Sequence, residues 1–337
     1  MYKPASPAVA AFPPDERMSS VSYTRERSVA IAAAQAAGDA VRAQYDAQTA
    51  ATYEKADGSP VTDADLASDR IIRTWLGGAF PDDAILTEEG ADDPARLSAE
   101  RVWIVDPIDG TAQFIARTGQ FDVLIALVVN GRPVVGVMLQ PSTGLYLAAN
   151  AGGGASAGIG DRTTAFRFTP LDCTAPRIKT SVWFGAPATL PLLNRVAGRV
   201  GSTGVMSGEV GVVARSLIDR MPDLALDGPT ASEIRPTEPV DVICGVPIAG
   251  DGTMAWEWDF AASDIVVTEA GGAFTDCWGR LHRYNKPRPR NAGGFVMSVD
   301  RETHARFLSA LKPELGELVV AEDGTHARVS PGGTSIG

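Results

Sequence analysis

Two carboxylates follow an apolar run in residues 103–111, which read WIVDPIDGT. Asp106 and Asp109 are separated by two residues, and Pro107 between them is incompatible with a regular helix. A turn at this point can direct both carboxylates and the Ile108 carbonyl toward one position, and such hard oxygen ligands suit Mg²⁺. An ordinary aspartate-rich turn contains the same residues, so the role of this segment depends on what the rest of the chain brings to it.

Gly110 and Thr111 complete this segment, where a turn or helix is expected to begin. Backbone N–H groups at the start of a helix lack partners within that helix, and they are therefore suited to hold a phosphate. The sequence thus predicts a phosphate position beside the two aspartates.

Two further acidic segments occur elsewhere in the chain. Residues 85–90, ILTEEG, place Glu88 and Glu89 at the end of a short apolar run, an arrangement that is also common on solvated surfaces. Residues 256–272, WEWDFAASDIVVTEAGG, place Asp259 just before an expected helix, where an N-cap could also bind a metal. Each segment is ambiguous when taken alone.

Taken together, and in their order along the chain, the three segments resemble the inositol monophosphatase-like phosphatases. The hallmarks of that family are a Glu-Glu pair, an Asp-Pro-Ile-Asp-Gly-Thr signature and a later Trp-Asp-x-Ala-Ala helix, and the resemblance covers about residues 25–310. It implies a phosphoric monoester hydrolase that needs two or three Mg²⁺ ions and is inhibited by lithium. It also implies an α+β fold, the layered α/β/α/β/α sandwich of that family.

The resemblance implies a set of metal ligands. Glu88, Asp106 and the Ile108 carbonyl would bind one ion, and Asp106, Asp109 and Asp259 would bind a second. Two ions about 3.5–4 Å apart can acidify a bound water and steady both the entering and the leaving oxygen. The expected reaction is therefore direct in-line attack by water, without a phosphoenzyme.

Other residues are implied to position water and substrate. Asp65 and Thr111 would orient the attacking water, and Glu89 would be a further water-orienting partner. Lys55 would add positive charge near the phosphate or the metals. The residues implied to bind substrate are Gly110, Thr111, Ser207 and Lys55.

The flanking segments bear on the substrate. Residues 55–62 (KADGSPVT), 119–128 (GQFDVLIALV) and 283–286 (RYNK) are most similar to the 3′(2′),5′-bisphosphate nucleotidases, which implies removal of the 3′-phosphate from adenosine 3′,5′-bisphosphate. The first of these segments is also similar in histidinol-phosphate phosphatases. The alternatives are therefore an inositol monophosphatase, a histidinol-phosphate phosphatase, a fructose-1,6-bisphosphatase, or a phosphatase for a phosphorylated nucleoside or sugar of specialised metabolism. An alternative of another class is a non-catalytic nucleotide-binding protein.

Two segments depart from the family pattern. Residues 206–214, MSGEVGVVA, lack the lysine that relatives carry where the organic part of the substrate is held, and residues 226–239 are also unlike the expected sequence. We expect the metal ligands to be retained and the leaving-group pocket in residues 207–239 to be altered.

Composition limits the possible partners. The 337-residue chain is 45% hydrophobic, enough for a substantial core, and its net charge of -11 disfavours binding to a nucleic-acid polymer. Cys173, Cys244 and Cys277 are widely separated and odd in number, which argues against a disulfide framework or a zinc cluster and favours the reducing cytoplasm. No apolar run reaches the roughly 18 residues of a membrane span. We expect a cytoplasmic protein that acts on a small phosphorylated metabolite, with a homodimer possible by analogy with relatives.

The hydrophobic pattern predicts the elements that position these residues. Helices are expected over residues 25–45, from the N-cap Thr62 toward Pro81, and over 192–200, 211–218 and 260–270, with a turn-rich connection over 55–61 between the first two. Short strands are expected over 84–86, 101–105, 121–129, 133–139 and 145–148. Asn130 and Gly131 predict a hairpin, because a type I′ turn needs positive φ at both positions.

This mixture of helices and hairpins favours α+β layering. The predicted organisation is a disordered extension over residues 1–22, an α+β subdomain with the metal site over 23–150, a second subdomain that completes the site over 151–315, and a loose tail over 316–337.

Overall fold

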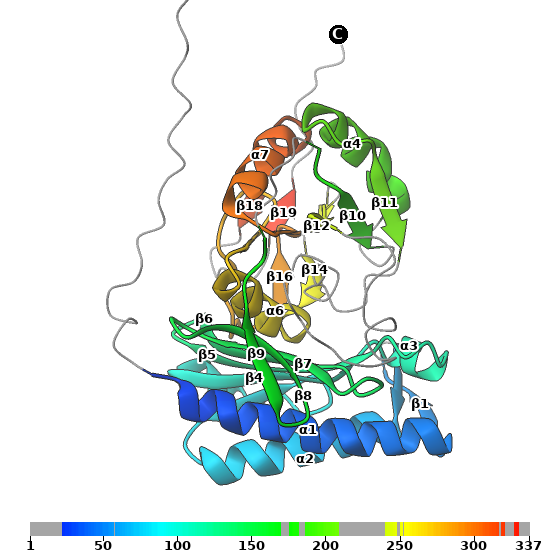
Figure 1. Cartoon of the computed structure of the whole chain (residues 1–337), viewed down its shortest axis with the longest axis vertical. Coiled ribbons are helices and arrows are strands. Elements are labelled where there is room, and N and C mark those ends of the chain that lie inside the picture. The colour runs from blue at the N-terminus through cyan, green and yellow to red at the C-terminus, as the bar shows by residue number, and fades with distance from the viewer. Residues whose placement is uncertain are drawn as a thin grey trace, which may run out of the picture.

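The computed structural model describes residues 22–56, 58–169, 175–181, 186–208, 240–247, 250–251, 253–316, 318–320 and 327–329. Residues 1–21, Cys173, the predicted helix over 211–218 and most of the altered pocket region lie outside these ranges. Within them, helices and sheets form five layers, from α1 and α2 at the bottom of Figure 1 to α4 and α7 at the top. This confirms the predicted α+β class.

Two N-terminal helices form the first layer, as predicted. They are α1 (Thr24–Ala47) and α2 (Asp63–Ala79). Thr62 caps α2, since its hydroxyl accepts a hydrogen bond from the backbone N–H of Ala64 at 3.2 Å. The connection between the helices, predicted to be rich in turns, also contains an antiparallel pair of strands, β1 (Thr52–Glu54) and β2 (Pro60–Thr62).

The second layer is a seven-stranded sheet in simple sequence order. Its strands are β3 (Ala84–Thr87), β4 (Arg101–Asp109), β5 (Asp122–Val129), β6 (Arg132–Leu139), β7 (Leu145–Asn150), β8 (Gly154–Ile159) and β9 (Arg162–Phe166). Only the pair β3 and β4 is parallel. The hairpin between β5 and β6 is confirmed, with φ of 50° at Asn130 and 77° at Gly131.

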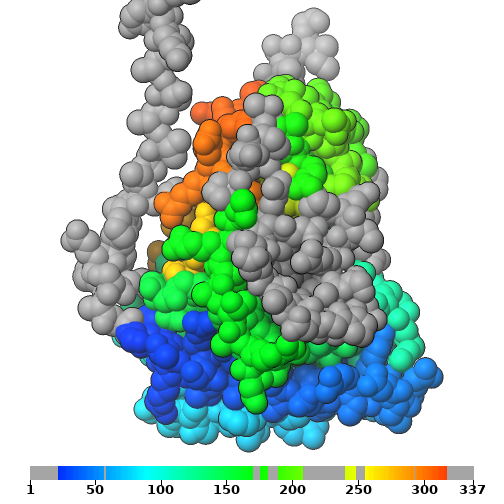
Figure 2. Space-filling view, in the orientation of Figure 1, coloured from blue at the N-terminus to red at the C-terminus, as the bar shows by residue number. Residues whose placement is uncertain are grey.

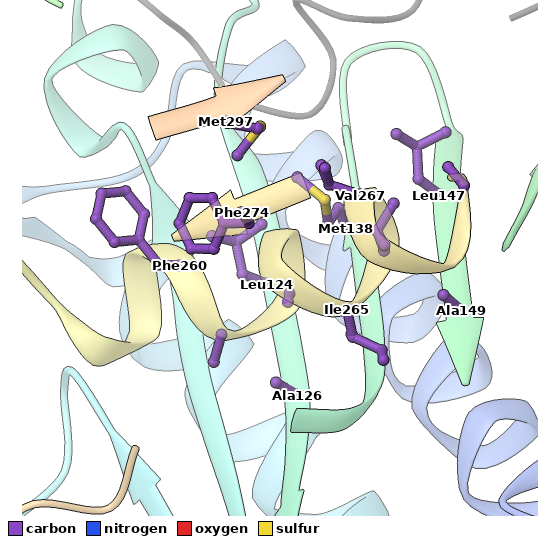
Figure 3. Close-up of a cluster of buried hydrophobic side chains, with 14 of the residues drawn as sticks. Leu124, Ala126, Met138, Leu147, Ala149, Phe260, Ile265, Val267, Phe274 and Met297 are labelled. Atoms are coloured by element: carbon purple, nitrogen blue, oxygen red, sulfur yellow. The ribbon is translucent and has the colours of Figure 1, made fainter. Parts of the chain in front are cut away.

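Helices bury both faces of this sheet. On one face, Trp103 and Ile125 pack with Ile72 and Leu76 of α2. The other face is covered by α6 (Glu257–Glu269), the helix predicted over residues 260–270. Figure 3 shows α6 lying across the strands, with Ile265 among the buried side chains there. The sheet is therefore buried on both sides, which explains why its central strands carry almost no polar residues.

Gly136 allows α6 to lie close to β6. A Cβ atom at this position would be 2.4 Å from Cγ2 of Ile265 and 2.6 Å from the carbonyl oxygen of Ala262. Such distances are shorter than real carbon contacts, so a larger residue would push the helix away from the sheet. The glycine thus helps to fix the height of α6 and of the carboxylate at its first turn.

A second, five-stranded sheet forms the fourth layer. Its order is β11 (Val205–Gly208), β10 (Ile178–Ser181), β12 (Val242–Gly245), β17 (Phe295–Ser298) and β15 (Ala273–Thr275). Two helices cover its outer face, α4 (Ala186–Arg199) and α7 (Arg301–Leu311), and Leu193 and Phe307 pack there with Val242 and Val296. Figure 2 shows these two helices at the opposite end of the molecule from α1 and α2.

Smaller pairings complete the structure. β14 (Thr253–Trp256) pairs with β16 (Arg290–Ala292) beside the start of α6. A three-stranded sheet joins β13 (Gly250–Asp251), β18 (Leu318–Val320) and β19 (Ala327–Val329), so part of the segment predicted as a loose tail forms strands. The first sheet runs to Phe166, past the predicted subdomain boundary at residue 150. None of the helices in the described residues has the length and apolar character that crossing a membrane requires.

Candidate active site

The parallel strands β3 and β4 bring two acidic segments to one edge of the first sheet. Glu88 directly follows β3, and its backbone N–H donates to the Val105 carbonyl at 3.2 Å. We expected the strand over residues 101–105 to end before Asp106, but β4 continues to Asp109. The pairing with β5 is irregular between Asp106 and Asp109, so the strand accommodates Pro107 without a turn out of the sheet.

Asp106 lies in an unfavourable environment for a charge. The residue is 2% exposed, and its Oδ1 atom is buried without a hydrogen-bond partner in the described structure. Burial raises the pKa of Asp106 well above its usual range, and the charges of Glu88, Asp109 and Asp259 raise it further. A buried carboxylate of this kind requires a compensating positive charge or proton.

Asp259 comes to the same place from the first turn of α6. We expected it to be the N-cap, but Trp256 holds that position and Asp259 is the third residue of the helix. Its Oδ2 accepts a hydrogen bond from the Trp256 backbone N–H at 2.8 Å, so the side chain folds back toward the helix start. Burial raises the pKa of Asp259 well above its usual range, with further contributions from Asp109 and Glu88.

These residues form a cluster that suits a divalent cation. Carboxylate oxygens of Asp106, Asp109 and Asp259 all lie within 4.8 Å of one another. Three carboxylates this close repel one another, and carboxylate oxygens are the hard ligands that Mg²⁺ prefers. Oδ1 of Asp106, which has no hydrogen-bond partner among the described residues, is available to bind a cation. The residues present therefore fit the metal that the sequence predicts.

Asp65 and Thr111, the two residues predicted to orient the attacking water, lie within hydrogen-bond distance of each other. The Thr111 hydroxyl is within hydrogen-bond distance of Oδ1 of Asp65, at 2.9 Å, and of the Ile108 carbonyl, at 3.2 Å. The other carboxylate oxygen, Oδ2, accepts from the backbone N–H and the hydroxyl of Thr62, at 2.8 and 2.5 Å. Burial raises the pKa of Asp65, while the hydrogen bonds from Thr62 and Thr111 lower it.

Lys55 lies between the two adjacent glutamates. Its Nζ atom is 2.6 Å from Oε1 of Glu88 and 2.6 Å from Oε1 of Glu89. Burial lowers the pKa of Lys55, but the hydrogen bonds and charges of the two glutamates outweigh burial and raise it above its usual value. Burial raises the pKa of Glu89 to about 7, against the opposing effect of Lys55. The lysine thus supplies positive charge beside the carboxylate cluster.

The remaining predicted residues are distributed differently. Gly110 has a φ of 91° and precedes the short helix α3 (Thr111–Ile115), directly after β4. Ser207 is exposed on β11 of the second sheet, and among the described residues no hydrogen bond joins it to the carboxylate cluster.

A buried polar network beside Asp259 was missed in the sequence. Glu257 is fully buried, and its carboxylate accepts hydrogen bonds from the backbone N–H groups of Asn285, at 2.6 Å, and Lys286, at 3.2 Å. Lys286 also forms an ion pair with Glu257. Arg96, in the 3-10 helix η1 (Pro94–Ser98), donates to Oδ1 of Asn285 at 2.7 Å. The sequence gave a faint signal, since Glu257 lies two residues before a predicted ligand and Lys286 lies in a segment already noted.

Comparison with known proteins agrees with this geometry. The sequence matches the inositol monophosphatase family over residues 23–168 and 244–315. It is 30% identical over 276 residues to the 3′(2′),5′-bisphosphate nucleotidase CysQ of Aggregatibacter actinomycetemcomitans, covering 80% of this chain and 91% of that protein. It is 42% identical over 120 residues to CysQ of Escherichia coli strain K12, a match that covers 34% of this chain and about half of that protein, 48%.

Solved structures show the same fold. The crystal structure of CysQ from Bacteroides thetaiotaomicron, described as a bacterial member of the inositol monophosphatase family, superimposes with a TM-score of 0.63. That comparison has 27% sequence identity and covers 83% of this chain and 98% of that one. The chain therefore belongs to the inositol monophosphatase family and is a phosphatase.

Proposed function

We propose that this phosphatase hydrolyses a phosphate monoester of a small metabolite with the help of Mg²⁺. The observation that carries the proposal is the cluster of Asp106, Asp109 and Asp259, with carboxylate oxygens within 4.8 Å of one another and a buried Oδ1 on Asp106 that has no partner in the described part of the chain. Such a cluster is costly in a folded protein unless a cation neutralises it. The cost is explained if the protein works with its ions bound.

The chain offers ligands for two ions. Glu88, Asp106 and the Ile108 carbonyl would hold one, and Asp106, Asp109 and Asp259 would hold the second, as the family resemblance implies. When bound, the ions supply positive charge that neutralises phosphate oxygens and makes a water molecule more acidic.

Asp65 and Thr111 are placed to orient that water. Because the Thr111 hydroxyl donates to Oδ1 of Asp65, its oxygen lone pairs stay available to accept a hydrogen bond from water. A proton from the water can pass to Oγ1 of Thr111 while the hydroxyl proton passes to Oδ1 of Asp65. The burial that raises the pKa of Asp65 makes this carboxylate a better proton acceptor than an exposed one.

Lys55 and Glu89 would adjust the charge of the same site. The Lys55 ammonium bridges Glu88 and Glu89, so it holds Glu88 in place at the edge of the cluster. Glu89 would not itself bind an ion in this arrangement, and its carboxylate could orient water. A direct contact from Gly110, Thr111 or Ser207 to the substrate remains part of the proposal.

The substrate that we favour is adenosine 3′,5′-bisphosphate, with hydrolysis at the 3′ position. The support is the CysQ relative that aligns along 91% of its length, together with the nucleotidase-like segments around Lys55 and Tyr284. Tyr284 is buried, and its hydroxyl donates to Oδ2 of Asp264 at 3.1 Å, so this part of the resemblance contributes to the support of α6. We further propose that the protein is cytoplasmic and forms a homodimer.

Phosphate release across a panel of monoesters tests the choice of substrate. We expect kcat/KM with Mg²⁺ to be at least about tenfold higher for adenosine 3′,5′-bisphosphate than for inositol 1-phosphate, histidinol phosphate or fructose 1,6-bisphosphate, a difference of roughly 1.4 kcal/mol in transition-state binding. A higher kcat/KM for any of the other three compounds would make that compound the favoured substrate instead of the nucleotide. Tight binding of the nucleotide without turnover would instead favour a non-catalytic nucleotide-binding protein.

A further inference from the structure

Arg290 lies near Asp259, one of the three clustered carboxylates, and stacks on an aromatic ring there. The Cζ atom of Arg290 lies 4.0 Å from the ring centroid of Trp256, and the two residues are cross-strand partners in the pair of β14 and β16. The Trp256 ring is itself stacked on Trp258, with centroids 4.8 Å apart and planes within 10°. Trp256 also provides the backbone N–H that Asp259 accepts. Trp256 thus contacts both the guanidinium of Arg290 and the predicted metal ligand Asp259.

Hydrogen bonds on both sides of Arg290 fix its backbone to the start of α6. The carbonyl of Pro289 accepts from the Glu257 N–H at 2.9 Å. The side-chain amide of Asn291, which is fully buried, donates to the Trp256 carbonyl at 3.0 Å. Arg290 therefore cannot move away from Asp259 without breaking bonds to the helix that carries Asp259.

Among the described residues, the guanidinium nevertheless has no acceptor for its Nε atom. Its Nε atom is buried without a hydrogen-bond partner, and within the described residues the side chain of Arg290 forms no ion pair, although the chain carries a net charge of -11. Its contact in that part of the structure is the face of Trp256. Stacking occupies the face of a guanidinium and leaves the N–H groups along its edge free to bind an anion in a bidentate manner. A buried donor without an acceptor is costly and calls for a partner.

We propose that Arg290 binds a second anionic group of the substrate, a phosphate other than the one that is hydrolysed. This inference rests on the proposed function, since it assigns a specificity residue to the same site. Only a substrate with two phosphates can occupy the carboxylate cluster and Arg290 together.

The position of Arg290 favours a second phosphate over the reacting one. The residues expected to handle the reacting phosphate, Asp65, Asp106 and Thr111, belong to α2, β4 and α3 on the side of the first sheet. Arg290 approaches from β16, on the side of α6, and its charge acts on Asp259, whereas the largest charges acting on Asp106 are carboxylates. An anion on Arg290 would thus lie on the α6 side of the cluster.

Two nucleotides that differ by one phosphate test the inference. Adenosine 3′,5′-bisphosphate and adenosine 3′-monophosphate carry the same scissile bond, and only the first has a second phosphate. We expect Arg290→Gln to raise KM for the bisphosphate by about 10- to 100-fold, the usual effect of losing a hydrogen-bonded charge, with KM for the monophosphate nearly unchanged. Arg290→Lys keeps the charge without the planar fork and should give an intermediate loss.

Controls separate this role from a structural one. Arg280→Gln removes an exposed arginine that precedes the same segment and lies 4.0 Å from Asp276, and it should leave both KM values unchanged. An equal change for both nucleotides in Arg290→Gln, or no change, would overturn the inference. If the wild type hydrolyses neither nucleotide, the proposed function fails instead. In that case, binding of both compounds with Mg²⁺ is measured by calorimetry. The inference predicts that the wild type binds the bisphosphate more tightly than the monophosphate and that Arg290→Gln removes this preference. It is refuted if the wild type shows no preference.

Discussion

Asp106→Asn is expected to lower kcat by at least about a hundredfold while the protein still folds. Asp106 is the one carboxylate assigned to both ions, and its Oδ1 is already free to bind one. The amide keeps nearly the same volume but removes a negative ligand, so both ions should bind more weakly and water should be less acidified. A hundredfold loss corresponds to about 2.7 kcal/mol of transition-state stabilisation, a reasonable share for metal assistance.

The same variant should be at least as stable as the wild type without metal. Replacing Asp106 removes repulsion with Glu88, Asp109 and Asp259, so Tm in chelator should hold or rise. Asp69→Asn on α2, where Asp69 pairs with Arg73 at 3.0 Å, serves as the control and should keep normal turnover. Near-normal kcat in Asp106→Asn, or collapse of its metal-free fold, would show that Asp106 is a structural residue of β4.

Glu257→Ala should have the largest effect on stability. The substitution removes a fully buried carboxylate and leaves Lys286 without its ion-pair partner and two backbone N–H groups without an acceptor. Breaking a buried pair from one side typically costs about 3–5 kcal/mol. We expect a loss of that size in the free energy of unfolding, and a fall in Tm on the order of 10 °C.

Urea unfolding of the variant measures this loss. Glu257→Gln should lose less, because the amide oxygen can still accept one of the hydrogen bonds. Glu302→Ala, an exposed position in the first turn of α7, should change the free energy of unfolding by less than about 0.5 kcal/mol. A loss below about 1 kcal/mol in Glu257→Ala would mean that the network with Lys286 does not support the site.

Local signals in the sequence predicted most elements of the first two layers. Thr62 as a helix cap and Asn130 with Gly131 as a hairpin turn are confirmed, because their conformations depend on short-range hydrogen bonds and steric limits. The predicted length of β4 was wrong, since the irregular pairing of β4 with β5 depends on a partner strand that local patterns do not specify. The prediction that Asp259 lies just before the helix was wrong for a similar reason. Trp256 is the residue that caps α6, and its position depends on its pairing with β16.

The site was predicted as a set of residues but not as a geometry. Spacing placed Asp106 and Asp109 together, and the family resemblance added Glu88 and Asp259 from distant segments. The supporting contacts were not predictable, because they join parts of the chain whose sequences carry no shared pattern. Arg290 is the main example, since a lone arginine at the start of a short strand has no distinctive signal until Trp256 is found against it.

Phosphate release by the wild type, with and without Mg²⁺, tests the central claim most directly. Adenosine 3′,5′-bisphosphate is incubated with the protein in Mg²⁺, in excess chelator, and in chelator followed by restored Mg²⁺. We expect turnover with Mg²⁺, a loss of at least about a hundredfold in chelator, and recovery when Mg²⁺ returns, because the carboxylate cluster then regains the charge that the chemistry needs. Full turnover in excess chelator would contradict the account, since the cluster of Asp106, Asp109 and Asp259 would then have no part in catalysis through a metal.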